Sequence, residues 1–275
     1  MPPQNIADGD YTTFIRKVRG LTGIDLSDYK PDQMRRRLLA LAGRFGETSL
    51  ANFAGRMERD PAAMTAFQGF FTINVSEFLR DASRWDDLAT QVLPGLVKGA
   101  DRRPFRVWSA GCSIGAEPYS LAMLLEEVTP ARPYAIFATD IDEAILARAR
   151  QGSGYQEAEL RNVSAARRTR FFEKDAAGVY RVKAALKAHI RFLRQDLLTS
   201  VPDRDLDLIV CRNVTIYFTE EAKRALYQRM AAALRPGGIL FVGGTEVITA
   251  ARDLGLEPFR TSFYRRGAAQ VAVAA

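Results

Sequence analysis

Two acidic side chains stand beside the ends of predicted strands, where they are placed to bind a ligand. Phe105–Ala110 predicts an apolar strand, Gly111 and Gly115 lie in the turn after it, and Glu117 falls at the start of the next helix. Asp140 ends the following predicted strand, where doubly wound folds place a carboxylate that binds ribose hydroxyls. The pattern indicates a site for an adenosine-bearing cofactor.

The spacing of the glycines distinguishes between such cofactors. A dinucleotide-binding turn carries G-x-G-x-x-G, because three glycines let backbone amides approach a pyrophosphate at a helix N-terminus. Here only Gly111 and Gly115 are present, and the carboxylate of Glu117 would repel phosphate. S-adenosylmethionine carries a sulfonium and an ammonium group and no phosphate, so we expect this cofactor. The alternative is a turn of small residues that binds nothing.

Composition bounds the class of protein. The chain has 275 residues, of which 47% are hydrophobic and 26% charged, enough for one large core and a smaller domain. No apolar run reaches the roughly 18 residues that a membrane span needs, and the first residues lack the features of a signal peptide. Cys112 and Cys211 fall at predicted buried strand ends, outside disulfide or metal spacing. We expect a cytoplasmic protein.

The single histidine, His189, excludes several chemistries. Its setting predicts the start of a strand, so a Ser-His-Asp or Cys-His arrangement is not expected. No Cys/His cluster has zinc-ligand spacing, and we expect no metal. Methyl transfer to a carboxylate needs neither a histidine nor a metal, since that nucleophile is ionised at neutral pH. The net charge of +7 indicates an acidic partner. Charge alone does not distinguish a nucleic acid, an anionic membrane and an acidic protein surface.

The elements from about Trp85 onward alternate between strand and helix, which is typical of a parallel sheet. The predicted helices cover Pro118–Val128, Glu143–Arg150 and Glu220–Leu234, and the last is followed by Arg235-Pro236-Gly237-Gly238 as a break. The predicted strands are Phe105–Ala110, Tyr134–Thr139, His189–Leu193, Leu206–Cys211 and Ile239–Gly243.

The region from about Tyr11 to Phe71 predicts helices alone. Asp28–Pro31 is a helix entry, and a buried stripe follows at helical spacing, made of Met34, Leu38, Leu41 and Phe45. Further amphipathic helices are indicated by Phe53, Met57, Met64 and Phe67. Arg36, Arg37 and Arg44 form a basic face beside the stripe. Without further context, such a face is interpreted as solvent-exposed.

These elements predict an α/β fold. It consists of a Rossmann-like doubly wound sheet, a small antiparallel β insertion and an N-terminal all-helical domain. We place the helical domain at residues 1–75 and the cofactor domain at 76–275. The insertion covers about 165–192, where a short strand at 179–182 follows the turn Asp175–Gly178.

Several long motifs carry a resemblance to a known family. In order, they are FTINVSEFLRD, VWSAGCSIGAEPYSLAM, ATDID, DLIVCRNVTIYF and LRPGGILFVGGTE, with DLSDYKPDQMRRRL ahead of them. Together they resemble CheR-type chemoreceptor methyltransferases over about Leu21 to Tyr264. The resemblance implies methyl transfer from S-adenosylmethionine to glutamate side chains on the signalling helices of a chemoreceptor. The products are glutamyl methyl esters and S-adenosylhomocysteine.

The resemblance also implies site residues. Glu117 would face the methionine ammonium and Asp140 the ribose, while Asp196 and Leu197 would flank the adenine. The remaining expected contacts to the cofactor are Asn74, Ser76, Arg80, Arg212 and Asn213. The expected catalytic residues are Arg80 and Tyr217, and the expected substrate-docking residues are Arg36, Arg37 and Arg44.

Physical arguments favour Arg80 for holding the substrate carboxylate, because a guanidinium fixes its orientation through two hydrogen bonds. The alternative is a surface salt bridge from Arg80 to Asp81 or Glu77. Tyr217 could equally be a packing residue, and Asn213 could cap the turn after its strand.

Two departures from the family pattern bear on function. Ala116 stands where the family commonly has a second glutamate, so only Glu117 carries that role. The short hairpin at Asp175–Gly178 predicts an enzyme that does not need the pentapeptide tail of a receptor. We expect a monomer with no nucleic-acid partner and no membrane insertion. The competing hypotheses are a nucleic-acid methyltransferase and a non-catalytic scaffold that binds the cofactor and docks on receptors.

Overall fold

The computed structural model describes residues 8–71, 76–98, 103–130 and 132–267. It divides into two compact units. One combines Met1–Ile73 with Tyr217–Arg224, and the other combines Asn74–Ile216 with Ala225–Ala275. No helix among the described residues combines the length and the apolar character that crossing a bilayer requires.

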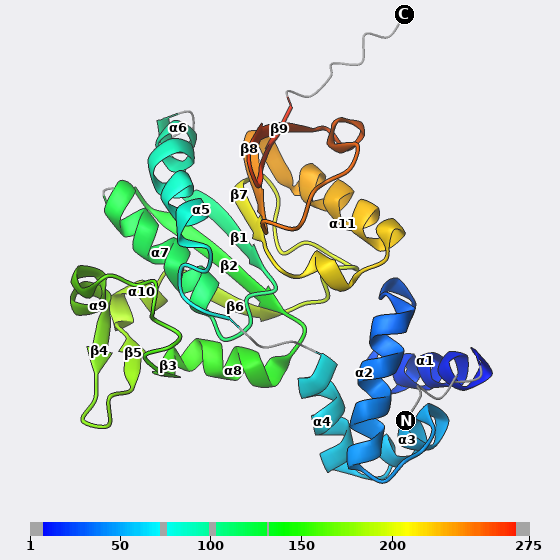
Figure 1. Ribbon diagram of the computed structural model, residues 1–275. Helices are drawn as coiled ribbons and strands as arrows, with labels where there is room; N and C mark the ends of the chain where they lie inside the picture. The colour runs from blue at the N-terminus through cyan, green and yellow to red at the C-terminus, as the bar shows by residue number, and fades with distance from the viewer. Residues whose placement is uncertain (1–7, 72–75, 99–102, 131, 268–275) are drawn as a thin grey trace, which may run out of the picture. The chain divides into compact units, whose positions relative to one another are not determined.

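The first unit is helical, as predicted. Its helices are α1 (Asp8–Thr22), η1 (Leu26–Asp28), α2 (Pro31–Arg44), α3 (Leu50–Met57) and α4 (Pro61–Phe71), and Figure 1 colours them blue to cyan. Helix α2 begins with proline at its first turn, where the missing N–H costs nothing. Rings from three helices form its core, with Phe14 6.4 Å from Phe53 and 6.1 Å from Phe67.

The predicted stripe of α2 is largely confirmed, since Met34, Leu38 and Leu41 are buried. Phe45 differs, because α2 ends at Arg44 and Phe45 is the half-buried residue that caps it. Its ring centroid lies 5.7 Å from that of Phe53.

A distant segment of the chain completes this unit. Tyr29 and Phe218 form an antiparallel bridge with ring centroids 4.9 Å apart. The amide of Lys30 donates to the carbonyl of Tyr217 at 2.9 Å, and the amide of Thr219 donates to the carbonyl of Asp28 at 2.9 Å. The segment that contains Tyr217 is therefore held by the entry to α2.

The second unit contains a seven-stranded sheet of order β6-β2-β1-β7-β8-β10-β9. The first five strands are mutually parallel, and β10 is antiparallel to both of its neighbours. All five predicted strands are present, in the order of a doubly wound sheet. The strands are β1 (Phe105–Ala110), β2 (Tyr134–Asp140), β6 (Ile190–Arg194), β7 (Leu206–Cys211), β8 (Leu234–Val242), β9 (Leu256–Arg260) and β10 (Phe263–Arg266).

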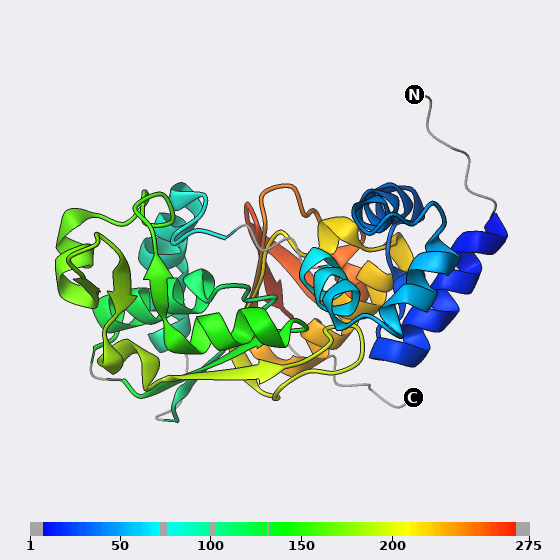
Figure 2. The same ribbon diagram turned by 90° about the horizontal axis from the view of Figure 1, so that it is seen from below.

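Helices accompany this sheet within the second unit (Figure 1). Strand β7 is buried along its whole length and β1 along nearly all of it, which explains their continuous apolar sequences. Figure 2 shows α8 running alongside the sheet, where it packs on β6 and β2. The helices are α5 (Ala82–Asp87), the π-helical turn η2 (Leu88–Val92), α6 (Leu93–Lys98), α7 (Ala116–Val128), α8 (Glu143–Gln151) and α11 (Glu220–Ala233), the last of which begins in the first unit.

One prediction in this unit is wrong. Residues Arg235-Pro236-Gly237-Gly238 were expected to separate helix from strand, but they belong to β8. The side chain of Arg235 donates to the buried carboxylate of Asp207 at 2.6 Å. A Cβ on Gly238 would lie 2.9 Å from the carbonyl oxygen of Leu206, so glycine permits this close approach of β8 to β7. Strands β9 and β10 were not predicted.

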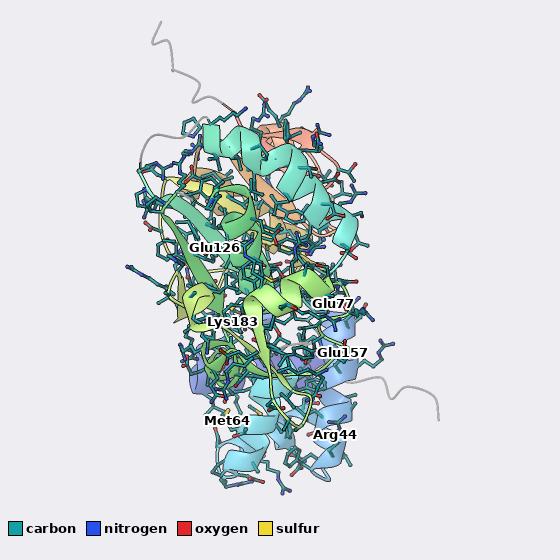
Figure 3. All side chains as sticks on the ribbon, turned by 90° about the vertical axis from the view of Figure 1, so that its left-hand side faces the viewer. Arg44, Met64, Glu77, Glu126, Glu157 and Lys183 are labelled. Carbon is teal, nitrogen blue, oxygen red and sulfur yellow. The ribbon has the colours of Figure 1, made fainter. Side chains whose placement is uncertain are left out.

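A second, smaller sheet has the order β3-β5-β4. Its strands are β3 (Ser153–Tyr155), β4 (Phe172–Lys174) and β5 (Tyr180–Val182), with α9 (Ala165–Phe171) and α10 (Ala184–Lys187) beside them. The expected turn closes β4 to β5 through the amide of Gly178, which donates to the carbonyl of Asp175. Strand β3 precedes the predicted insertion. Figure 3 labels Glu157 and Lys183 in this region.

Candidate active site

The turn after β1 is fixed by the end of β2. Gly111 and Gly115 have φ values of +80° and +87°, which favour glycine. The amides of Gly111 and Cys112 both donate to the carbonyl of Thr139 at 2.9 Å. The turn lies at the carboxyl ends of the parallel strands, beside the point between β1 and β7 where the strand order reverses. Open α/β sheets bind ligands at such a switch point.

Asp140 lies at the end of β2 and is 7% exposed. Its carboxylate accepts hydrogen bonds from the amides of Ser113, at 2.8 Å, and Asp142, at 3.1 Å. Burial raises the pKa of Asp140, and these two hydrogen bonds oppose the rise. Each oxygen keeps a further lone pair, so the carboxylate can also accept hydrogen bonds from a ribose diol.

Glu117 lies in the first turn of α7, and its Oε1 accepts a hydrogen bond of 2.7 Å from the hydroxyl of Ser109. Burial raises its pKa to about 7. The positive charge of Arg212 opposes this rise, and the negative charge of Glu246 adds to it. A nearby cationic ligand would favour the ionised form of this buried carboxyl and so lower its raised pKa.

Arg212 follows β7 and has a side chain that is only 2% exposed. Its Nη1 donates to the carbonyl of Arg80 at 2.9 Å, and its Nη2 lies 2.5 Å from the carboxylate of Asp81. The guanidinium also stacks over Phe241, 4.8 Å from the ring centroid. Burial lowers the pKa of Arg212, and the charges of Glu117 and Asp81 oppose this effect. Its buried Nε has no hydrogen-bond partner among the described residues.

The segment that carries Arg80 has an unusual backbone. Leu79 and Asp81, on either side of Arg80, have φ values of +52° and +61°. Such conformations are unfavourable for a residue like leucine and persist only where the surroundings impose them. Here the amide of Leu79 donates to the Ser120 hydroxyl at 3.0 Å, and the indole of Trp85 donates to the carbonyl of Arg80 at 2.8 Å.

The two acidic residues close to Arg80 in the chain each pair with an arginine. Asp81 pairs with Arg212, and Glu77, which Figure 3 labels, pairs with Arg161. The Arg80 side chain is half-buried, and its charge adds to the lowering of the Arg212 pKa that burial causes.

The other expected cofactor contacts are distributed over nearby loops. Ser76 is half-buried, whereas Asn74 lies outside the described residues. Asp196 accepts a hydrogen bond of 2.8 Å from the amide of Leu198, and Leu197 is buried. The amide of Gln195 donates to the carbonyl of Asp140 at 2.9 Å, which joins the segment after β6 to the end of β2.

Asn213, directly after Arg212, adopts a left-handed conformation with φ of +60°. Its amide donates to Glu246 at 2.6 Å. Sequence reasoning missed Glu246 as a site residue, although it ends the motif LRPGGILFVGGTE. The available signal was a glutamate two positions after the glycine pair that ends a predicted buried strand.

The remaining expected site residues belong to the helical unit. Arg36 and Arg44 are exposed on α2. Arg37 differs, because its Nη2 donates to the carbonyl of Phe70 at 2.7 Å and its guanidinium stacks on the Phe70 ring. Burial lowers the pKa of Arg37, and interaction with Tyr217 opposes that effect. Arg37 therefore joins α2 to α4.

The residues of the second unit fit S-adenosylmethionine. Glu117 would bind a cationic group, Asp140 retains acceptor capacity, and the orphaned Nε of Arg212 is a donor for a carboxylate such as that of the methionine moiety. Among the described residues, no group of His, Cys, Asp and Glu side chains has the arrangement of a metal site. The sheet order and these side chains define the class of protein, which is the S-adenosylmethionine-dependent methyltransferases.

Within this class the chain belongs to the CheR methyltransferase family. Residues 74–261 match the SAM binding domain of the family, and residues 9–72 match its all-alpha domain. The chain is 44% identical to a chemotaxis protein methyltransferase of Listeria monocytogenes, over 93% of this chain and 96% of the relative. It is 36% identical to chemotaxis protein methyltransferase 1 of Vibrio cholerae, over 90% of this chain and 92% of the relative. Identity to the Escherichia coli chemotaxis protein methyltransferase is 32%, over 88% and 85% of the two chains.

Proposed function

We propose that this enzyme transfers a methyl group from S-adenosylmethionine to glutamate side chains on the cytoplasmic helices of a chemoreceptor. The products are glutamyl methyl esters and S-adenosylhomocysteine. The observation that carries the proposal is the buried carboxylate of Glu117, whose raised pKa favours a cationic ligand, at the head of α7. The names of the relatives, chemotaxis protein methyltransferases, support the choice of acceptor.

The bound cofactor supplies an electrophilic methyl group on a sulfonium. Transfer of this methyl group to an acceptor oxygen, with loss of the bond from carbon to sulfur, would cancel a negative and a positive charge. No proton has to be removed first, because a glutamate is ionised at neutral pH. The enzyme therefore contributes mainly by aligning the reactants and excluding water.

The side chains of the site divide this work. Glu117 binds the ammonium group of the cofactor, and Asp140 binds the ribose hydroxyls. Asp196 and Leu197 flank the adenine. The wall of the site is completed by Ser76, Arg212 and Asn213.

Arg80 and Tyr217 act on the reacting groups. Arg80 holds the acceptor carboxylate through paired hydrogen bonds, which fix its orientation. The backbone from which this side chain extends is held by Trp85 and Arg212, which both donate hydrogen bonds to the carbonyl of Arg80. The residues on either side of Arg80 are in the left-handed conformation. Tyr217 is the second catalytic residue in this proposal.

The helical domain, which we assign to residues 1–75, docks on the receptor. Arg36 and Arg44 are exposed, and their charge would raise the rate of encounter with acidic receptor helices. Arg37 contributes to the same face while bracing α2 against α4. The catalytic domain then covers residues 76–275, with its β insertion at about 165–192.

We also propose a monomeric enzyme of the cytoplasm that acts without a receptor tail peptide. The tight turn at Asp175–Gly178 supports independence from such a tail. The family match disfavours both a nucleic-acid methyltransferase and a non-catalytic scaffold.

The direct test incubates the protein with radiolabelled S-adenosylmethionine and purified receptor signalling domains. Methyl esters release methanol in mild alkali, whereas methylated bases do not. We expect alkali-labile label on the receptor, and none on a control receptor whose methylation-helix glutamates are replaced by alanine. Label that resists alkali, or label on added nucleic acid instead, would contradict the proposal. Activity that survives in Arg80→Ala would remove Arg80 from the mechanism.

A further inference from the structure

Glu246, in the turn after β8, is a buried carboxylate that collects backbone donors from two strand ends. The residue is 5% exposed. Its Oε2 accepts from the amides of Asn213, at 2.6 Å, and Gly243, at 2.9 Å. Its Oε1 accepts from the amides of Val214, at 3.0 Å, and Thr215, at 2.8 Å, and from the Thr215 hydroxyl at 2.8 Å. These donors fill the acceptor capacity of one carboxylate.

The donors on the β7 side form the turn that follows Arg212. Asn213 adopts a left-handed conformation there, which is uncommon for a residue other than glycine. Consecutive amides from Asn213 to Thr215 point to one carboxylate, so Glu246 fixes the path of the backbone. Release of this turn would shift Asn213 and the buried guanidinium of Arg212.

The same turn touches the expected cofactor turn after β1. A Cβ on Gly111 would lie 2.6 Å from Cγ2 of Val214, so the valine packs directly on the glycine. The amide of Val214 is one of the donors to Glu246. Glu246 therefore connects the ends of β8, β7 and β1 through one loop.

The charge of Glu246 also acts on the site. It raises the pKa of Glu117 and opposes the depression of the Arg212 pKa. The titratable groups that interact with Glu117 are thus Arg212 and Glu246, together with the buried thiols of Cys112 and Cys211. Glu246 belongs to the same buried charge cluster as the proposed ligands of the cofactor.

We infer that Glu246 is a positioning residue of the cofactor site, which holds Arg212, Asn213 and Val214 in the geometry that binds S-adenosylmethionine. The inference rests on the proposed function of this site. If Glu246 served stability alone, its replacement would lower the melting temperature without selectively weakening the binding of the cofactor.

Two variants separate the charge of Glu246 from its geometry. Glu246→Gln keeps the shape but turns one acceptor into an NH2 group that faces backbone donors. Gly243→Ala keeps the charge, but its Cβ would lie 2.3 Å from Oε2 of Glu246 and 3.2 Å from the amide nitrogen of Asn213, so the carboxylate must move. Gly243 has no positive φ, and alanine is compatible with its backbone. Glu257→Gln, an exposed position in β9, is the matched control.

The measurements are KM for each substrate, calorimetric affinity for S-adenosylhomocysteine and melting temperature. We expect both variants to raise KM for S-adenosylmethionine and the Kd of the product about tenfold. KM for the receptor should stay unchanged, and the control should match the wild type. Wild-type cofactor affinity in Gly243→Ala would overturn the inference even if Glu246→Gln fails to fold. Equal increases in both KM values would overturn it too. Failure of the wild-type protein to bind the product would instead overturn the proposed function.

Discussion

The guanidinium of Arg212 and the carboxylate of Asp81 lie 2.5 Å apart, although the two residues are 131 positions apart in the chain. The same guanidinium donates to the carbonyl of Arg80. One buried side chain at the end of β7 therefore fixes the strained segment that presents Arg80. Only the arginine of this pair is buried, since the Asp81 side chain is 51% exposed, so removal of Asp81 would leave the buried charge of Arg212 with one partner fewer.

Replacement of Arg212 by lysine should lower both turnover and cofactor affinity. Lysine keeps the charge but cannot bind the carbonyl of Arg80 and the carboxylate of Asp81 in one plane. We expect kcat/KM for the receptor to fall by about 10- to 100-fold, from the loss of one or two charged hydrogen bonds. Steady-state kinetics measures the effect. Arg161→Lys, which changes a largely exposed side chain paired with Glu77, is the control and should keep wild-type kinetics.

Binding of S-adenosylmethionine should depend on pH through Glu117. Its raised pKa of about 7 means that the carboxyl is increasingly neutral below pH 7 and loses its attraction for the ammonium group. Affinity should therefore fall as pH decreases from 8 to 6, by up to about tenfold per unit below the pKa. Binding near pH 6.5 should release protons, which calorimetry in buffers of different ionisation enthalpy detects.

Glu117→Gln tests the assignment of this pH dependence. The variant should bind the cofactor more weakly at pH 8, and its affinity should be nearly constant from pH 6 to 8. A variant that retains the wild-type slope would assign the titration to another group.

Asp140→Ala should weaken cofactor binding about tenfold, because one set of charged hydrogen bonds to the ribose is lost. It should also lower the melting temperature, since the amides of Ser113 and Asp142 lose their acceptor. Asp253→Ala, at an exposed position near the C-terminal strands, is the control for both measurements. Unchanged calorimetric affinity in Asp140→Ala would rule out the ribose contact.

The three arginines of α2 that we expect at the docking face should fall into two groups. Charge reversal at Arg36 and Arg44 should raise KM for the receptor severalfold at low salt, with a smaller effect at high salt, because exposed charges are screened. Arg37→Ala should instead lower the melting temperature, because it removes the hydrogen bond to the carbonyl of Phe70 and the contact with its ring. Receptor methylation at several salt concentrations, combined with thermal unfolding, distinguishes the two groups. An effect of Arg36 or Arg44 that is independent of salt would argue against docking by charge.

Much of the fold followed from local patterns. The apolar runs at 105–110 and 206–211 predicted strands because parallel strands are buried on both faces. Both strands are present. Helical spacing predicted a buried stripe of Met34, Leu38, Leu41 and Phe45, of which the first three are buried on α2 and Phe45 is the half-buried residue after its end. The path of Arg235–Gly238 was mispredicted, because proline and glycine normally end an element. Here the pairing of β8 with β7, and the buried ion pair with Asp207, hold these residues in a strand.

The sequence by itself determined the fold class, the choice of a cofactor without phosphate and the family, because these depend on residue types at short spacing. Only the tertiary structure decided which polar groups share one buried environment. The pairing of Arg212 with Asp81, the convergence of backbone amides on Glu246 and the contact of Arg37 with Phe70 each join distant parts of the chain. The pKa of Glu117 depends in the same way on burial and on charges that other strands bring near it. Such interactions arise only when folding excludes water and closes the loops between them, so no local pattern encodes them.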